Sequence, residues 1–230
     1  MPWLPELFSA PVLQQVLDQR RRDALVAVPY FDGLLAGDPD PLVESFAAAP
    51  ELLDPVRGRV KGQAAFRAFV TETSAWLREH DASVDDVEHV ILERSGFEEV
   101  VLHVVTERGR VDLPVAVVAE RRPDGRIDEI RVYFDTEPLT GRSTGRAPLL
   151  QPDTGLAVPA VVASYVEALG AAHDARLEIC ALVDDGRACA LEYNVVRPGT
   201  ALALPQAGLA VLVADGDGLA AARVYGDSGA

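Results

Sequence analysis

Residues 28–41 read Val-Pro-Tyr-Phe-Asp-Gly-Leu-Leu-Ala-Gly-Asp-Pro-Asp-Pro, and residues 53–62 read Leu-Asp-Pro-Val-Arg-Gly-Arg-Val-Lys-Gly. The first stretch places Tyr30 on a helix that ends at Gly37, because glycine is frequent where helices end. The second stretch places Asp54, directly before a proline, at the mouth of a short hairpin. A phenol and a carboxyl group in an otherwise apolar neighbourhood form a plausible acid and base pair.

Apolar residues recur at helical spacing in several segments around these two stretches. The spacing predicts an N-terminal helix that begins after Ser9, a helix over 30–37, a short helix over 42–48 and a longer helix over 63–80. Pro29 separates the first two of these helices, because proline interrupts a helix. A short pair of strands is expected over 51–60. Helices therefore precede the main run of strands.

From Val84 onward the pattern changes to runs of β-branched residues, which favour strands. The runs cover residues 87–92, 100–105, 113–118 and 130–134. Turn signals such as Arg108-Gly109 and Asp124-Gly125 separate them, so the strands should form an antiparallel meander. Helices first and strands afterwards predict an α+β fold, with the helices on one face of a curved sheet.

The second half of the chain is an imperfect, shortened repeat of the first half. Residues 163–174 are similar to 28–38, and residues 204–227 are similar to 113–135. Between the helix and the first strand of this second copy, nothing matches residues 40–82. Its sheet would expose an apolar face, so we expect that face to pack on the first copy or, in a homodimer, on a second chain.

The segment between the two copies is rich in Pro, Gly and Thr and has no periodicity, which is typical of a linker. The sequence therefore predicts a first domain over 1–137, a linker over 138–156 and a truncated second unit over 157–230.

Composition excludes some classes of function. With 36 acidic and 21 basic residues, the net charge of −15 argues against binding to a phosphate backbone, so no nucleic acid is expected as a partner. No apolar run is long enough to cross a bilayer and no signal peptide is recognisable, so we expect a cytoplasmic protein that has no membrane partner. Cys180 and Cys189 flank a turn, so in a hairpin they would lie either directly opposite each other, which would permit a disulfide, or on a diagonal, which is too long to bridge easily. We expect free thiols.

The order of these elements, with an Ala-Gly-Asp turn after the helix of Tyr30 and an Asp-Pro hairpin at Asp54, resembles the nuclear transport factor 2-like superfamily. The SnoaL-like and ketosteroid-isomerase-like branch is the most similar. The resemblance covers residues 24–136 and, as a truncated copy, 157–227. It implies a cone of three helices on a strongly curved antiparallel sheet, followed by a second partial copy of the same unit. Two such units also occur in polyether epoxide hydrolases and cyclases of this superfamily.

The resemblance also implies roles for individual residues. Tyr30 falls where ketosteroid isomerases carry the tyrosine of their oxyanion hole, and Asp54 falls at their general base. Their second oxyanion-hole acid has no counterpart, because Ala116 occupies that position. The pocket lining is expected to include His103, Ala116, Phe134 and Trp76.

We therefore expect an enzyme that needs no cofactor and no metal, and that acts on an apolar small molecule by isomerisation, cyclisation or epoxide opening. Asp54 would be the base and Tyr30 the proton donor. One alternative is a non-catalytic module of the same fold that binds a ligand or another protein. A third is a regulatory partner in a larger assembly, which predicts an exposed apolar sheet face on the second unit.

Overall fold

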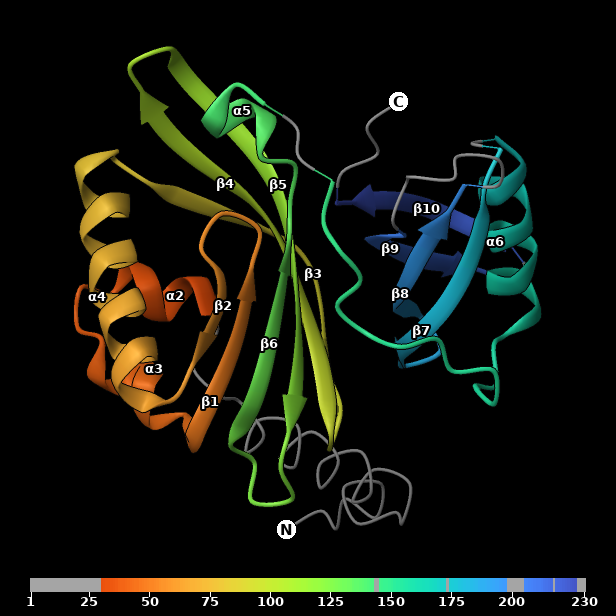
Figure 1. The fold of residues 1–230 in the computed structure, drawn as a ribbon, viewed down its shortest axis with the longest axis horizontal. Coiled ribbons are helices and arrows are strands. Elements are labelled where there is room, and N and C mark those ends of the chain that lie inside the picture. The colour runs from red at the N-terminus through yellow and green to blue at the C-terminus, as the bar shows by residue number, and fades with distance from the viewer. Residues whose placement is uncertain (1–29, 143–144, 173, 198–204, 217, 227–230) are drawn as a thin grey trace, which may run out of the picture.

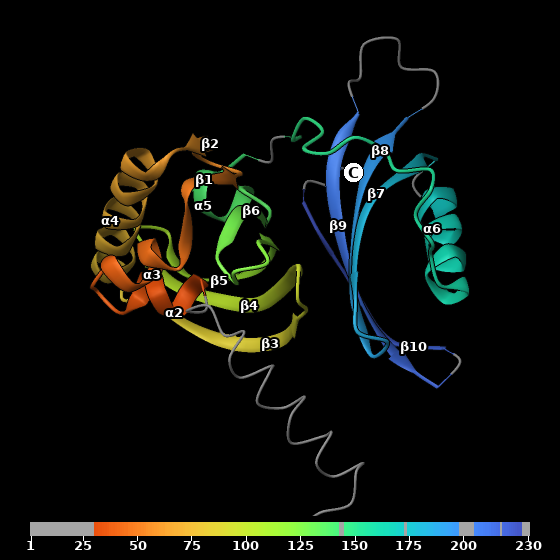
Figure 2. The same cartoon turned by 90° about the horizontal axis from the view of Figure 1, so that it is seen from below.

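The structure is a computed structural model that describes residues 30–142, 145–172, 174–197, 205–216 and 218–226. The helix expected after Ser9 lies outside the described residues. The described chain forms two β-sheets, each with helices on one of its faces (Figure 1). The sheets turn their helix-free faces toward each other, as the second view shows (Figure 2). The α+β fold is thus present in two consecutive units.

Six strands form the first sheet, in the order β2-β1-β6-β5-β4-β3. Their bounds are Phe46–Asp54 for β1, Gly58–Lys61 for β2, Ser83–Ile91 for β3, Ser95–Thr106 for β4, Gly109–Arg121 for β5 and Ile127–Tyr133 for β6. Strands β3 to β6 form the expected antiparallel meander. However, β1 and β6 run parallel, so the sheet is mixed and the expectation of a purely antiparallel sheet is wrong at this pair. The strong curvature that the resemblance implies stays a prediction.

Three helices cover one face of this sheet: α2 at Tyr30–Leu35, α3 at Asp40–Glu44 and α4 at Gln63–Glu79. Helix α4 buries Phe66, Phe69, Val70 and Leu77, which recur at the spacing of one helical face. These side chains pack with inward-facing residues of the strands, such as Val100, in one hydrophobic core. We call this side of the first sheet the helix-covered side.

The short second helix differs from the expectation. It ends at Glu44, and Phe46–Asp54 forms β1, whereas the sequence predicted helix as far as residue 48. The Ile127 amide donates to the Ser45 carbonyl, and Phe46 then stands beside Ile127 in the parallel pair. An apolar run of this length suits either a helix or a buried strand, so contacts with β6 decide the outcome.

The second unit has helix α6 at Ala160–Ala172, after a short helix α5 at Glu137–Thr140 in the expected linker. Its sheet has the order β10-β9-β8-β7. The strands are β7 at Arg176–Asp184, β8 at Ala188–Val196, β9 at Gln206–Asp215 and β10 at Gly218–Tyr225. Helix α6 packs on the face of this sheet that carries Leu191 and Leu212.

The internal repeat extends to the pairing register. In the first sheet Glu99 stands opposite Ala116, which stands opposite Tyr133. In the second sheet Glu192, Leu209 and Tyr225 make the same row across β8, β9 and β10. Both sheets also carry an irregularity at the same place, between Asp86 and Glu88 and between Ile179 and Ala181. The similarity seen in the sequence therefore reflects an equivalent four-stranded meander in each sheet, β3 to β6 and β7 to β10.

The two sheets pack face to face through a shared hydrophobic core. This core takes members from both units. The first sheet contributes Val90, Phe97, Ala116, Val118 and Tyr133, and the second contributes Val183, Ala188, Ala190, Ala207, Leu209, Val211 and Tyr225. The apolar sheet face of the second unit is thus covered by the first unit. The exposed face that the third alternative predicted is not present in the described chain.

Two buried carboxylates lie within this contact. Glu192 accepts hydrogen bonds from Arg131 Nε at 2.6 Å and from the Tyr133 hydroxyl at 2.6 Å. Glu99 accepts the equivalent bonds from Arg223 and Tyr225 of the other unit. Each unit therefore supplies one glutamate and one Arg-Val-Tyr segment, so the contact has approximate two-fold symmetry, like the interface of a symmetric dimer.

The two cysteines are free and buried, which confirms the expectation of thiols. Cys180 occupies the strand irregularity in β7, whereas Cys189 stands opposite Asp184 at the start of β8, so they do not face each other. Burial raises the pKa of the Cys180 thiol to about 11 and that of Cys189 to about 12, so both are poor nucleophiles. Among the described residues, no helix combines the length and apolar character needed to span a membrane.

Candidate functional site

Asp54 is the last residue of β1, where the chain turns into β2. Its Oδ1 atom accepts hydrogen bonds from the backbone amides of Val56 and Arg57, both at 2.8 Å. This is the turn that an Asp-Pro sequence favours. The residue is only 9% exposed, and burial raises the pKa of its carboxyl group, although the two amides and Arg146 act in the opposite direction. The carboxyl group is therefore more basic than an ordinary aspartate.

Tyr30 lies at the start of the described part of α2 and is buried in the helix-covered core. Its ring packs edge to face against Phe31, with the centroids 5.2 Å apart. Burial, and after it the charges of Asp54 and Glu98, raise the pKa of the Tyr30 hydroxyl well above its usual value. The phenol thus stays protonated, and the charge of Asp54 is one cause of this shift.

Glu98, which the sequence interpretation missed, is the third member of this group. It lies on β4, and its Oε2 atom accepts a hydrogen bond from the Tyr30 backbone amide at 3.0 Å. Burial raises its pKa to about 7, with smaller upward contributions from Asp32 and Asp86, while the amides at the start of α2 oppose the shift. A carboxyl group of this pKa can hold or release a proton near neutral pH.

Two oxygen atoms of this group make no hydrogen bond to the part of the chain that the structure describes. Tyr30 Oη and Asp54 Oδ2 have no hydrogen-bond partner among the described residues. Among the described residues, Ser74 Oγ is the one side-chain oxygen or nitrogen atom that is both fully buried and without a hydrogen-bond partner. Tyr30 Oη and Asp54 Oδ2 therefore keep some contact with solvent.

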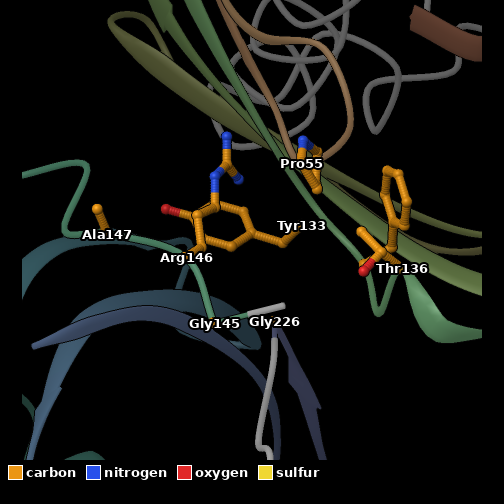
Figure 3. Close-up of a pocket in the computed structure, with 8 residues that line it drawn as sticks. Pro55, Tyr133, Thr136, Gly145, Arg146, Ala147 and Gly226 are labelled. Atoms are coloured by element: carbon orange, nitrogen blue, oxygen red, sulfur yellow. The ribbon is translucent and has the colours of Figure 1, made fainter. Parts of the chain in front are cut away.

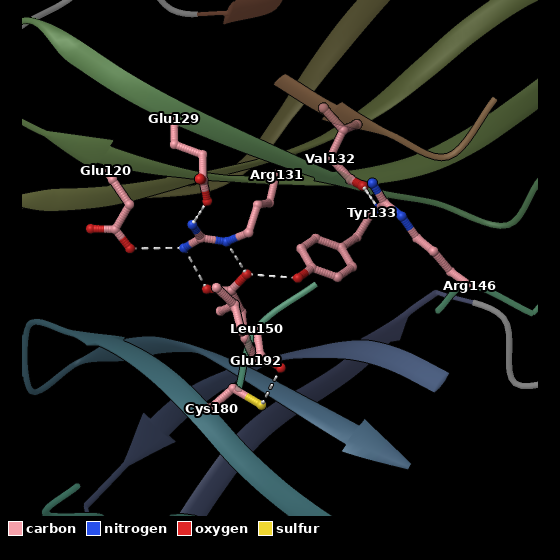
Figure 4. A network of polar contacts seen from close by, with 9 residues as sticks. All are labelled: Glu120, Glu129, Arg131, Val132, Tyr133, Arg146, Leu150, Cys180 and Glu192. Atoms are coloured by element: carbon pink, nitrogen blue, oxygen red, sulfur yellow. Dashed lines mark hydrogen bonds and ion pairs between the residues drawn. The ribbon is translucent and has the colours of Figure 1, made fainter. Parts of the chain in front are cut away.

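A cavity of about 200 Å³ lies beside the Asp54 turn (Figure 3). Residues that line it include Pro55, Tyr133, Phe134, Thr136, Arg146 and Gly226. It therefore lies where the β1–β2 turn, the end of β6, the linker and the end of β10 come together. Arg146 Nη1 donates to the Val132 carbonyl, and its guanidinium lies 5.6 Å from the centroid of the Tyr133 ring (Figure 4).

His103 does not line the helix-covered side, which corrects the sequence expectation. Its neighbours on β4, Leu102 and Val104, are in the helix-covered core, so alternation along the strand places His103 on the opposite face. There its Nδ1 lies 2.7 Å from Asp112 and its Nε2 lies 3.1 Å from Asp85. These two carboxylates raise the pKa of the imidazole. The residue forms a surface ion pair.

Ala116 also faces away from the expected pocket, because it is buried in the core between the two sheets. On β5, Val115 and Val117 are the residues that face the helices. Ala116 therefore does not stand where an oxyanion-hole acid would reach a ligand beside Tyr30. The acid that the structure does place on that side is Glu98.

Phe134 and Trp76 both pack on the helix-covered core. Phe134 also lines the cavity beside Asp54. Trp76 stacks on His80, with the ring centroids 4.2 Å apart, and does not line that cavity. Of the predicted site residues, Asp54 thus contributes to the raised pKa of the Tyr30 hydroxyl, and Phe134 lines the cavity beside the Asp54 turn.

No protein-family model and no curated protein matches the chain. Among solved structures, an epoxide hydrolase/cyclase-like enzyme, SalBIII, is 23% identical with a TM-score of 0.43, covering 53% of this chain and 95% of that one. An NTF2-like protein of unknown function from Cytophaga hutchinsonii is 16% identical with a TM-score of 0.40, covering 44% and 89%. A putative polyketide cyclase from Sinorhizobium meliloti is 19% identical with a TM-score of 0.37, covering 45% and 88%. These matches describe a likeness of fold over about half of the chain and do not establish an activity. A second sheet follows the first in this chain.

Proposed function

We propose that the chain is a cofactor-independent enzyme that transfers protons on an apolar small molecule in its first unit. One observation carries this proposal: Glu98 accepts a hydrogen bond from the Tyr30 backbone amide beside an apolar core, where burial and then the charges of Asp54 and Glu98 raise the pKa of the Tyr30 hydroxyl. Ionisable groups whose environments shift their pKa values away from the usual range are a common feature of acid and base catalysts.

Asp54 acts as the base. Its Oδ1 atom is held by the two amides of the turn, so Oδ2 is oriented and remains open to a substrate or a water molecule. Burial makes the carboxylate more basic, because the charged form is poorly solvated.

Tyr30 acts as the proton donor. Its hydroxyl stays neutral at physiological pH and can donate a hydrogen bond to an oxygen on which negative charge develops. Glu98 holds the backbone of Tyr30 and, with a pKa of about 7, exchanges protons with bound water near neutral pH.

Isomerisation, cyclisation and epoxide opening all use such a pair. In epoxide opening, Asp54 takes a proton from water while the water oxygen attacks an epoxide carbon. The carbon–oxygen bond of the ring breaks, and the ring oxygen receives a proton from Tyr30. In isomerisation, Asp54 removes a proton next to a carbonyl whose oxygen accepts a hydrogen bond from Tyr30. The second unit, which has no counterpart of Asp54, serves as a brace.

The test is a turnover screen with apolar ketones and epoxides, using the wild type and the Asp54→Asn, Tyr30→Phe and Glu98→Gln variants. Each change should lower turnover of an accepted substrate by about 10²–10⁴-fold, the usual contribution of a positioned acid or base. Glu44→Gln is a matched control, because Glu44 is exposed on α3. If the three site variants turn over an accepted substrate as fast as the wild type and the Glu44→Gln control do, the assignment is wrong.

A second candidate is a non-catalytic ligand-binding module. The observation that favours it is the filling of the helix-covered side by large buried side chains such as Phe66 and Leu52. The cavity beside Asp54, at about 200 Å³, is also smaller than most sites for drug-sized ligands. In this case ligands would bind the Asp54→Asn variant and be released unchanged.

A further inference from the structure

The cavity beside the Asp54 turn is lined by a positively charged side chain, Arg146, that the proposed reaction does not use. Arg146 comes from the linker, and its guanidinium is positioned by the Val132 carbonyl and the ring of Tyr133. Arg146 lines this cavity together with Pro55 and Thr136, which belong to the first unit (Figure 3). A positive charge from the linker thus lies at the edge of the first unit.

The guanidinium retains hydrogen-bond donors that the protein does not use. Within the described ranges, no carboxylate lies within ion-pairing distance of Arg146, and the Val132 carbonyl is the one acceptor of a hydrogen bond from its side chain. None of its nitrogen atoms is both fully buried and unpartnered. The remaining donors are therefore accessible, and Arg146 lines the cavity. An arginine with free donors in a partly buried site is a receptor for a carboxylate, because its planar group can bind both oxygens.

We propose that this cavity binds the carboxylate group of a small apolar acid through Arg146. The substrate class of the neighbouring site would then be an apolar carboxylic acid, and this second clause rests on the function proposed above.

The walls of the cavity support this choice of ligand. Pro55, Phe134 and the ring of Tyr133 offer apolar surfaces, whereas Arg146 supplies a positive charge. The volume of about 200 Å³ accommodates a small aromatic acid or the acid end of a longer molecule. A neutral molecule of the same shape would leave the guanidinium donors without an anionic partner, and so should bind more weakly.

Binding here should also influence Asp54. The charged groups that act on its carboxyl group are Arg146 and Arg57, which lower its pKa, and the buried hydroxyl of Tyr30 lies in the same field. A bound carboxylate offsets the charge of Arg146 and thereby raises the pKa of Asp54. The acid end of a substrate would thus make the base stronger when the site is filled.

The test uses benzoate as the probe and benzamide as its neutral analogue, with the full chain and ¹³C and ¹⁵N NMR. We expect benzoate to shift the amide resonances of Gly145 and Ala147 in a saturable way and to raise the pKa of Asp54. Benzamide should bind at least about tenfold more weakly, since it lacks the charge-assisted bonds. Arg146→Met should weaken benzoate binding by a similar factor, and Arg142→Met, at an exposed position of the same linker, should not.

Equal affinities for benzoate and benzamide in the wild type would overturn the proposal without any variant. So would undiminished benzoate binding to a folded Arg146→Met protein; Arg146→Lys, which keeps the charge, should retain part of the binding. Because binding is measured directly, its failure is distinct from failure of the proposed reaction. Saturable, Arg146-dependent binding with no turnover of any ketone or epoxide would support this site and remove only the enzymatic function.

Discussion

Arg131 Nη2 lies 2.8 Å from Glu192 Oε2 across the contact between the two sheets (Figure 4). Arg223 and Glu99 repeat this contact in the opposite direction. Both glutamates are almost fully buried, so each needs its partners from the other unit. The pairing fixes which strands face each other, and it explains why the truncated second copy retains its Arg-Val-Tyr segment.

We predict that Arg131→Ala lowers the free energy of unfolding by about 3–5 kcal/mol, because it leaves the buried Glu192 carboxylate without its charged partner. Urea denaturation of the full chain measures this change. The control is Arg187→Ala, which breaks another ion pair between the two units, Arg187 with Glu88, at a more exposed position. That change should cost less than about 1 kcal/mol. Equal losses of unfolding free energy in the two variants would show that burial of the Arg131–Glu192 pair does not increase the cost of breaking it.

The element order and the short strand pair over 51–60 were predictable from the sequence, whereas the parallel pairing of β1 with β6 was not. Helix α4 and the meander have strong 3.6-residue and two-residue patterns. The apolar run that begins at Phe46 has neither pattern. Its strand conformation depends instead on contacts with β6 and with the Phe66 ring, both of which are distant in the sequence. Local preference cannot reveal a partner that is remote in the sequence.

The side of the sheet on which each site residue lies was harder to predict, for a physical reason. Strand β4 is buried on both sides, by the helices on one face and by the second sheet on the other. Alternation then gives two equivalent sets and does not say which one faces the helices, so the side predicted for His103 was wrong. Glu98 and Glu99 are adjacent in the sequence, yet each has partners on its own face of β4. Knowing that Leu102 faces the helices would have identified Glu98 by alternation.

We predict that the chain is monomeric in solution at micromolar concentration. The sheet faces through which the sequence suggested a homodimer are already paired within one chain, and residues such as Leu209 and Val211 are fully buried there. Size-exclusion chromatography with light scattering gives the mass directly. A dimer that disappears in Arg131→Ala would instead mean that the sheets pair between two chains.

The two roles of Asp54 should be separable. Asparagine keeps an Oδ1 acceptor for the amides of Val56 and Arg57, so Asp54→Asn should leave stability within about 0.5 kcal/mol while abolishing the base. Asp54→Ala also removes these bonds and should cost about 1 kcal/mol more. Thermal or urea unfolding measures both changes. If the two variants are equally stable, the turn does not depend on the Asp54 side chain.

Glu98 should make the folded state less stable as the pH rises from about 4.5 to about 7. Its pKa is raised from 4.5 to about 7 by folding, so between these values the unfolded chain releases a proton that the folded chain retains. Below about 4.5 both states are protonated and above about 7 both are ionised, so the loss is confined to this window. A shift of this size corresponds to about 3 kcal/mol.

The measurement is the free energy of unfolding of the wild type and of Glu98→Gln at pH 4.5 and at pH 8. Glutamine can still accept the hydrogen bond from the Tyr30 amide but does not ionise, so the variant should be stabilised relative to the wild type at pH 8 more than at pH 4.5. Glu44→Gln, at an exposed position of α3, should show no such difference between the two pH values. Equal effects of Glu98→Gln at both pH values would mean that the Glu98 carboxyl group ionises normally in the folded protein, which would remove it from the proposed catalytic group.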